Sequence, residues 1–482
     1  ADYRVVGAIH WERSPGNRVR INAQLVRVDS DVARWSESFE GDLAGIFDMQ
    51  QRVARAVGRA LDVTMAPDAE AAHRPRPTGN LAAYDYYLRG NEYFNRSWDR
   101  SDIEAAGSLY RKAVALDSTY ATAWAKLSRV EASIYWEYFD HSEARRVAAY
   151  DAACRALALN PTLPEAHEAL GYCYYHCDRD YARAVAQWEQ GLVLDPNNCE
   201  LANALAAVNR RQGELEQAAA GFIRALQLDP RSHLKAFDIA LTYGMMRRYT
   251  ESDQYLSRVI ELAPDYPLAH IYRAWLPILR EGDITAAGQI VDKARLHTDL
   301  TQSKYYWWLL RLLEDPGQHA AITLTPISDT VACLLFRAQS ARLAGDNVSS
   351  SLYADSARVL LEVKLSSQPD DARFLSDLGM AWADLGNRER ALKYAVRAVE
   401  LLPTWREAFD APFLLLNLAE VFVIFGEHDA AVEQLRTVLS MPGFASEAYL
   451  RTDPLWEPLH NHAGFRELLG ERAQSSSRTT RP

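Results

Sequence analysis

The stretch that decides the fold is residues 374–403, which read FLSDLGMAWADLGNRERALKYAVRAVELLP. Small residues stand in it at fixed offsets around one tryptophan, and a proline closes it. The positions that carry this pattern are Leu378, Gly379, Trp382, Gly386, Ala391, Ala395, Ala398 and Pro403. Small side chains recur where two helices cross too closely for larger ones, so the stretch predicts a helical hairpin.

The same pattern repeats along the chain with a period of about 34 residues. Prolines that close successive units stand at Pro161, Pro196, Pro230 and Pro264. Twelve positions before these prolines, and before the proline that ends the first stretch, the small residues are Ala149, Ala184, Ala218, Ser252 and Ala391. Because one hairpin cannot bury its apolar faces alone, such repeats stack into a solenoid with a concave and a convex surface.

The repeats predict a mainly α fold, a right-handed superhelix of nine or ten hairpins over residues 80–442. Nine units lie near residues 80–119, 120–162, 163–196, 197–230, 231–264, 265–298, 329–371, 372–406 and 407–442. The pattern decays over residues 299–328, where a degenerate tenth unit is expected. Residues 443–470 are expected to cap the last hairpin, and the Ser-, Thr- and Arg-rich residues 471–482 are expected to be disordered.

The N-terminal residues 1–62 do not follow the 34-residue period. Two alternating stretches, residues 3–12 and 18–28, predict a strand hairpin with a turn at residues 14–17. A third strand is expected near residues 33–39, followed by an amphipathic helix whose apolar positions are Ile46, Met49, Val53, Val57 and Leu61.

Three strands and one helix form an incomplete sheet domain, and its first strand has a bare edge. The chain also begins with Ala1 rather than methionine. We therefore expect the sequence to start inside a larger polypeptide, with a linker at residues 63–79 between the sheet and the repeats.

The hairpin pattern resembles the tetratricopeptide repeat (TPR), which residues 374–403 match almost position by position. The N-terminal residues resemble the second half of a TolB-like amino-terminal domain, which commonly precedes TPR arrays in bacterial signalling proteins. The residues that carry this likeness are Tyr3, Arg4, Val5, Val6, Gly7, Arg18, Val19, Arg20, Gln24, Leu25, Trp35, Phe39, Asp42, Leu43, Ile46, Phe47 and Gln50. The segments NLAAYD (80–85), YADSAR (353–358) and DPLWEPL (453–459) resemble the C-terminal region of bacterial TPR-containing serine/threonine protein kinases.

This resemblance spans most of the chain and implies a place in a larger protein. In such kinases a catalytic domain and a membrane helix precede the TolB-like domain, which implies that the repeats are an extracytoplasmic sensing or docking region. Similar repeats are also joined to adenylate cyclases or DNA-binding regulators, for which a cytoplasmic location is expected. The kinase, the membrane helix and the first half of the TolB-like domain are absent from this chain. The sequence therefore does not decide whether the repeats serve a kinase or, alternatively, an adenylate cyclase or DNA-binding regulator.

Charge and hydropathy limit the classes of partner that we expect for this chain. The 482 residues include 53 Lys+Arg and 64 Asp+Glu, a net charge of −11, without a basic cluster that could neutralise phosphates. No nucleic-acid partner is therefore expected. No stretch reaches the roughly 18 apolar residues of a membrane helix, so no membrane span is expected in this chain.

The sequence contains none of the motifs that anchor common catalytic chemistries. Kinase loops, a Gly-x-Ser-x-Gly elbow, a Gly-x-Gly-x-x-Gly turn and a His-Glu-x-x-His pair are all missing, so no catalytic residue and no cofactor is expected. An unrecognised catalytic site in the groove is the remaining alternative.

One grouping, Cys173, His176 and Cys177, has a spacing that could hold zinc. The favoured interpretation is that both cysteines are small packing residues and that His176 is a solvated helix end, so no metal is expected. The five cysteines are an odd number and lie on predicted helices, which does not indicate a disulfide framework.

Aromatic clusters supply candidate anchors for a partner. Most are expected to fill the space between helices, although tyrosine and tryptophan are favoured at binding hot spots. The candidates for the concave groove are Tyr87, Tyr135, Trp136, Tyr174, Tyr243 and Trp307. We therefore expect a non-catalytic scaffold or sensor that binds a protein or peptide in this groove, with self-association through the bare N-terminal strands as a further interaction.

Overall fold

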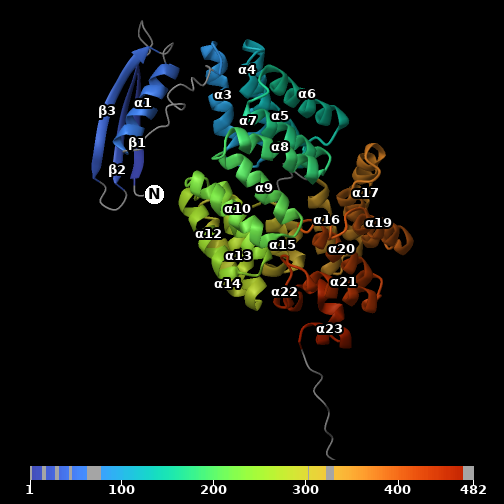
Figure 1. Cartoon of the computed structure of the whole chain (residues 1–482). Helices are drawn as coiled ribbons and strands as arrows, with labels where there is room; N and C mark the ends of the chain where they lie inside the picture. Colours follow the sequence, from blue (N-terminus) through green and yellow to red (C-terminus); the bar gives the residue numbers. More distant parts are fainter. Residues whose placement is uncertain are drawn as a thin grey trace, which may run out of the picture.

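The computed structural model describes residues 3–12, 18–27, 32–42, 46–61, 77–301, 303–321 and 330–470. It has two parts, a small sheet with one helix and a long array of helical hairpins (Figure 1). The predicted turn at residues 14–17, most of the predicted linker and the predicted disordered tail lie outside the described residues.

The N-terminal part is a three-stranded antiparallel sheet with one helix on one face. Its strands are β1 (Tyr3–Glu12), β2 (Arg18–Arg27) and β3 (Ala33–Asp42), in the order β1-β2-β3, and helix α1 is Ile46–Ala60. The small core between sheet and helix consists of Val19, Ala23, Phe39, Met49 and Ala56. Within the described residues β1 pairs with β2 alone, so its other edge is bare.

The rest of the described chain is an array of antiparallel helix pairs. The pairs are α3 (Leu81–Phe94) with α4 (Arg100–Leu116), α5 (Ala121–Trp136) with α6 (Glu143–Leu159), α7 (Pro164–Tyr172) and π-helix η2 (Cys173–Cys177) with α8 (Tyr181–Leu194), α9 (Cys199–Arg211) with α10 (Leu215–Leu228), α11 (His233–Met245) with α12 (Tyr249–Leu262), α13 (Pro267–Glu281) with α14 (Ile284–Ala294), α16 (Thr330–Leu343) with α17 (Asn347–Ser367), α18 (Ala372–Asp384) with α19 (Arg388–Leu401), and α20 (Ala411–Ile424) with α21 (His428–Ser440). Between α14 and α16 lie helix α15 (Lys304–Leu313) and the 3₁₀ helix η3 (Pro316–Ala321), which packs on α16. The prediction of a TPR superhelix with a small α+β piece is confirmed.

Local sequence explains where the helices start and why they pack closely. The side chains of Asn80, Ser142 and Asn198 accept hydrogen bonds from the first free N–H groups of their helices, as N-caps do. The recurring small residues are buried at the helix crossings. A Cβ added to Gly171 would lie 2.1 Å from Trp188 Nε1, so only glycine fits that crossing.

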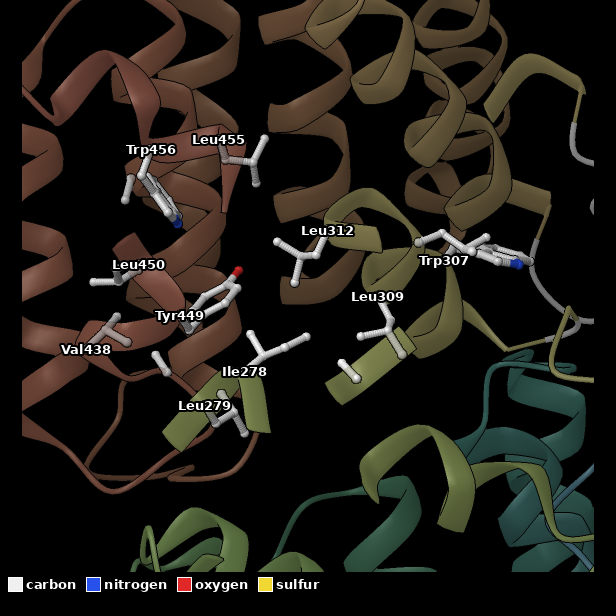
Figure 2. Packing of buried hydrophobic residues seen from close by; sticks show 14 of the residues in the cluster. Ile278, Leu279, Trp307, Leu309, Leu312, Val438, Tyr449, Leu450, Leu455 and Trp456 are labelled. Carbon is white, nitrogen blue, oxygen red and sulfur yellow. The ribbon is translucent and has the colours of Figure 1, made fainter. Parts of the chain in front are cut away.

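The C-terminal segment packs into the largest described core cluster. It consists of α22 (Glu447–Thr452), 3₁₀ helix η4 (Pro454–Leu459) and α23 (Ala463–Leu468). Figure 2 shows Tyr449 beside Ile278 and Leu279 of α13, and Leu450 and Trp456 belong to the same cluster. This segment therefore covers apolar surface of hairpins that precede it by well over a hundred residues.

Candidate binding site in the closed interior

The superhelix curls until its C-terminal hairpins meet its central ones. The backbone N–H of Ala408 donates to the carbonyl of Arg211 at 2.7 Å, and the N–H of Gly443 donates to the carbonyl of Met245 at 2.9 Å. Figure 1 accordingly shows the orange and red helices beside the green ones. The open concave groove expected from the sequence is thus bridged by the chain itself.

Three hairpin turns have an unusual backbone. Several turns of the array use a glycine in the left-handed region, such as Gly213 at φ 85°. Among the described residues, the non-glycine residues in that region are Tyr138, Arg179 and Arg247, with φ of 62°, 51° and 58°. This conformation costs a residue with a Cβ on the order of 1 kcal/mol, so contacts elsewhere must offset it.

The side chains of these three residues supply such contacts across the interior. The Tyr138 hydroxyl donates to Asp371 Oδ2 at 2.6 Å, and Arg179 Nη1 lies 3.4 Å from Glu407 Oε2. Arg247 Nη2 donates to backbone carbonyls in the last turn of α21 and just beyond it, the nearest that of Leu439 at 2.9 Å. The strained turns therefore hold the returning C-terminal half.

A buried charge cluster lies at the centre of this closure. Arg211 Nη1 donates to Glu407 Oε2 at 3.0 Å and to Asp410 Oδ2 at 2.8 Å, and Arg373 Nη2 donates to the same Asp410 oxygen at 2.8 Å. Burial alone would raise the pKa of Asp410, but Arg211, Arg373 and Arg179 hold it well below its usual range. Asp410 therefore stays charged, and the cluster links hairpins that lie about 200 residues apart in the sequence.

The interior of the array contains a cavity of about 430 Å³. Its walls are largely aromatic and include Trp136, Trp275, Tyr305, Trp308, Phe409 and Phe444. A volume of this size suits a small molecule or a few residues of peptide, whereas a folded domain would not fit. Charged groups of both signs interrupt the aromatic wall, as expected of a binding site rather than a closed core.

Glu137 is the cavity carboxylate that lacks a partner inside the protein. It follows α5, its side chain is exposed toward the cavity, and no described side chain lies within hydrogen-bonding or ion-pair distance of it. Burial raises its pKa, against the opposing charges of Arg373, Lys304 and Arg211. These three cations act on Glu137 only at a distance, and a buried carboxylate without a hydrogen-bond donor is costly, so Glu137 points to a cationic or hydrogen-bond-donating ligand.

A second network runs from Glu420 in the cavity wall to Asp384, which does not line the cavity. Arg342 pairs with both carboxylates, and its Nε lies 2.7 Å from Asp384 Oδ1. Gln339 joins Glu420 at 2.7 Å to Arg311 at 2.6 Å. The network thus connects helices α15, α16, α18 and α20.

This network predicts a pH dependence of stability. Burial raises the pKa of Asp384 to about 6, with Arg342 opposing the shift, whereas an unfolded aspartate has a pKa of about 3.9. Between these values the folded chain holds a proton that the unfolded chain has lost, so this group's contribution to stability falls as pH rises from about 4 to about 6. The variant Asp384→Asn lacks the titrating group. Between about pH 4 and 6 its free energy of unfolding is therefore expected to decrease by up to about 3 kcal/mol less than that of the wild type.

Urea unfolding of wild type and Asp384→Asn at several pH values between 4 and 7 measures this difference. The matched control is Asp370→Asn, because Asp370 is an exposed aspartate whose side chain is 68% accessible. Parallel pH profiles for wild type and Asp384→Asn would contradict the prediction.

Of the six aromatic residues predicted for the groove, Trp136 lines the cavity. Tyr87 packs against Tyr110 and Tyr120 in the first hairpins. Tyr135 stacks on His141. The structure does not bring these residues together, and contact of Tyr87 and Tyr135 with a partner stays a prediction.

The other three predicted groove residues also lie away from the cavity wall. Tyr174 meets Tyr150 edge to face, and Tyr243 stacks on Tyr255. Trp307 is 1% exposed and faces Phe336 in the core, whereas its neighbours Tyr305 and Trp308 line the cavity. Their contact with a partner likewise stays a prediction.

The expected solvated position of His176 is wrong. The π-helix η2 turns this residue inward, where it is 7% exposed and its ring lies 4.9 Å from Trp136. Burial, together with Arg129 and Arg211, holds the pKa of His176 well below its usual value. Burial also raises the pKa of the Cys173 and Cys177 thiols, which disfavours the thiolate form that binds zinc. In the part of the chain that the structure describes, no three His, Cys, Asp or Glu side chains are grouped to hold a metal.

None of the described helices combines the length and the apolar character needed to cross a bilayer. No family model matches the sequence. The chain is 31% identical over 116 residues to putative adenylate cyclase 3 of Rhizobium meliloti (strain 1021), covering 24% of this chain and 20% of that protein. It is 26% identical over 298 residues to cellulose synthase operon protein C of Xanthomonas axonopodis pv. citri (strain 306), covering 56% of this chain and 19% of that protein. The chain thus spans about a fifth of the length of the curated relatives that it matches.

Similar solved structures include other TPR proteins. A thermophilic TPR protein of Thermus thermophilus has a TM-score of 0.35 and 17% identity, covering 41% of this chain and 100% of that one. The human IFIT1 dimer with PPP-AAAA has a TM-score of 0.42 and 18% identity, covering 75% of this chain and 81% of that one. Because these TM-scores are low, the fold assignment rests on the hairpin packing described above.

Proposed function

We propose that this chain is a non-catalytic binding module, which binds a segment of a protein or peptide partner in its internal cavity. The observation that carries this proposal is the unpaired Glu137 carboxylate inside an aromatic-walled cavity of about 430 Å³. A site of this kind binds and orients a ligand. The described residues that line it include no serine, threonine, cysteine or histidine, the residue types of the common nucleophile–base pairs.

The cavity favours a short segment with a basic side chain. Trp308 in the cavity wall offers an aromatic surface to the stem and charge of a lysine or arginine, and Glu137 supplies the counter-ion. Trp136 is already stacked on His176 and has Arg211 over its ring. Arg211 and Arg373 stand nearby but are already paired with Asp410. The carboxylate left over therefore sets the preferred charge of the ligand.

Peptide selection followed by calorimetry tests this proposal. Peptides selected on the wild-type chain are expected to share a basic residue, and Glu137→Gln is expected to weaken their binding by at least about tenfold, since a charged hydrogen bond contributes about 1.5–3 kcal/mol. The control is Glu261→Gln, because Glu261 is an exposed glutamate outside the cavity lining. Selected peptides without a basic residue, or equal affinity for Glu137→Gln, would reject this mode of binding.

We further propose that the module belongs to a longer bacterial signalling protein. Support comes from the likeness of its N-terminal residues to part of a TolB-like domain and from the short span of its relatives that it covers. The resemblance to bacterial TPR-containing kinases favours a serine/threonine kinase as the output domain of this longer protein. The alternative, an adenylate cyclase or transcriptional regulator, gains support from the 31% identity to a putative adenylate cyclase. Sequencing the reading frame upstream of Ala1 separates these outputs.

A further inference from the structure

Helix α17 carries apolar residues on two opposite faces. Its inner face packs on the neighbouring helices through Ser350, Ala354, Ala357 and Leu361. On its outer face, between 47% and 82% of each residue is exposed at Val348, Leu352, Val359 and Val363. With 3.6 residues per turn, the outer four fall within about 60° of one another, roughly opposite the buried four. Exposed helix faces are normally polar, so this apolar stripe indicates a surface that another chain covers.

The outer stripe is symmetric about a midpoint just after Asp355. Val348 and Val363 are equally far from that midpoint, and so are Leu352 and Val359. If two such helices pack in antiparallel, each of these residues therefore meets its mirror position on the other copy. A two-fold symmetric contact requires a surface that complements itself in this way.

The charges beside the stripe fit the same arrangement. Arg358 bonds Asp355 at 2.8 Å and Glu362 at 2.6 Å within its own helix, on one flank of the stripe. In an antiparallel pair, the charged flank of one helix faces the same flank of the other helix. Arg358 therefore lies beside the other copy's Asp355 near the midpoint. A parallel pair would instead place the charged flank against Ser356 and Leu360, which carry no charge.

We propose that this chain forms a two-fold symmetric dimer, in which the outer faces of two α17 helices pack in antiparallel. Helix α17 has 21 residues, so the seam is short and we expect a weak dimer that dissociates at micromolar concentration. None of the residues that line the cavity comes from α17, which lies at the outer edge of the array (Figure 1). Dimerisation through α17 therefore leaves the cavity free for its ligand.

Analytical ultracentrifugation of the whole chain tests the proposal. The wild type is expected to shift from monomer toward dimer as its concentration rises through the micromolar range. Leu352→Glu is expected to stay monomeric over the same range, because it places a carboxylate in the apolar seam. The matched control is Leu296→Glu, since Leu296 is 81% exposed on another hairpin, and this variant is expected to dimerise like the wild type. Circular dichroism establishes that both variants keep the helical fold.

Cysteine cross-linking tests the direction of the pair. Under mild oxidation, a Val348→Cys chain and a Val363→Cys chain are expected to join to each other rather than to themselves, above the background set by the exposed Cys154 of the wild type. A wild type that is monomeric throughout, or a Leu352→Glu chain that dimerises normally, would overturn the proposal. A dimer that Val5→Lys abolishes and Leu352→Glu leaves intact would also overturn it, and would assign the contact to the bare strand β1.

Discussion

Replacing Glu407 with alanine is expected to lower the free energy of unfolding by about 3–5 kcal/mol. Glu407 is fully buried, and its Oε2 accepts hydrogen bonds from Arg211 at 3.0 Å and from the Tyr181 hydroxyl at 2.8 Å. Its other oxygen accepts the backbone N–H of Phe409 at 3.0 Å. Alanine would leave the Tyr181 hydroxyl and the Phe409 N–H without this acceptor, and would leave Arg211 with Asp410 as its remaining carboxylate partner inside the protein.

Urea unfolding followed by circular dichroism measures this loss. Asp370→Ala is the matched control, because Asp370 forms an exposed ion pair with Arg397 at 3.0 Å, and exposed pairs contribute about 0–1 kcal/mol. Glu407→Gln is expected to fall between the two, since an amide oxygen can still accept hydrogen bonds. Small-angle scattering should also show a larger radius for Glu407→Ala if the C-terminal half swings away. Equal losses for Glu407→Ala and Asp370→Ala would mean that the charge cluster does not hold the array closed.

The repeats were predictable because their signal is local. Each small residue placed twelve positions before a loop proline is buried at a helix crossing, as at Ala149, Ala184 and Ala218, which are fully buried. The strands of the N-terminal sheet were predictable for the same reason, since alternation of apolar and polar residues decides which side faces the helix. Val19 and Ala23 are accordingly buried, while Arg18 and Arg20 between and beside them are exposed.

The closure of the array was not predictable from these patterns. Small rotations between successive hairpins accumulate along a solenoid, so which distant hairpins meet depends on the sum of many local angles. Glu407 therefore looks like an ordinary loop residue in the sequence, although it pairs with Arg211 almost 200 residues away. One sequence signal did exist. Tyr138, Arg179 and Arg247 occupy turns where other hairpins use glycine, and such residues indicate a contact that offsets their strain.

The cavity residues illustrate a second limit. The segment KYYWWLL at residues 304–310 reads as one aromatic cluster, and Trp307 was the groove residue predicted from it. One residue along a helix turns the side chain by about 100°, so Trp307 faces the core whereas Trp308 faces the cavity. Choosing between them requires the packing of α15 against its neighbours, which the sequence pattern of a degenerate repeat does not contain.

Replacing Trp456 with alanine is expected to cost about 3–5 kcal/mol, the range for truncating a buried aromatic side chain. Trp456 lies in η4 and is 1% exposed, within the cluster that also contains Tyr449, Leu450 and Val438 (Figure 2). Alanine would leave a large cavity between the C-terminal segment and the hairpins beneath it. Hydrogen exchange of α20 and α21 is expected to speed up, because these helices lose the segment that covers them.

Trp405→Ala is the matched control for this experiment, because the same residue type is 80% exposed there and should change stability by less than about 0.5 kcal/mol. The comparison tests whether residues 443–470 act as a cap on the last hairpin, as we propose. In a stacked array each hairpin depends on its neighbour, so removing a true cap should open the end hairpins before the central ones. If Trp456→Ala and Trp405→Ala unfold alike, with unchanged exchange in α20 and α21, the C-terminal segment only lies on the array and does not stabilise it.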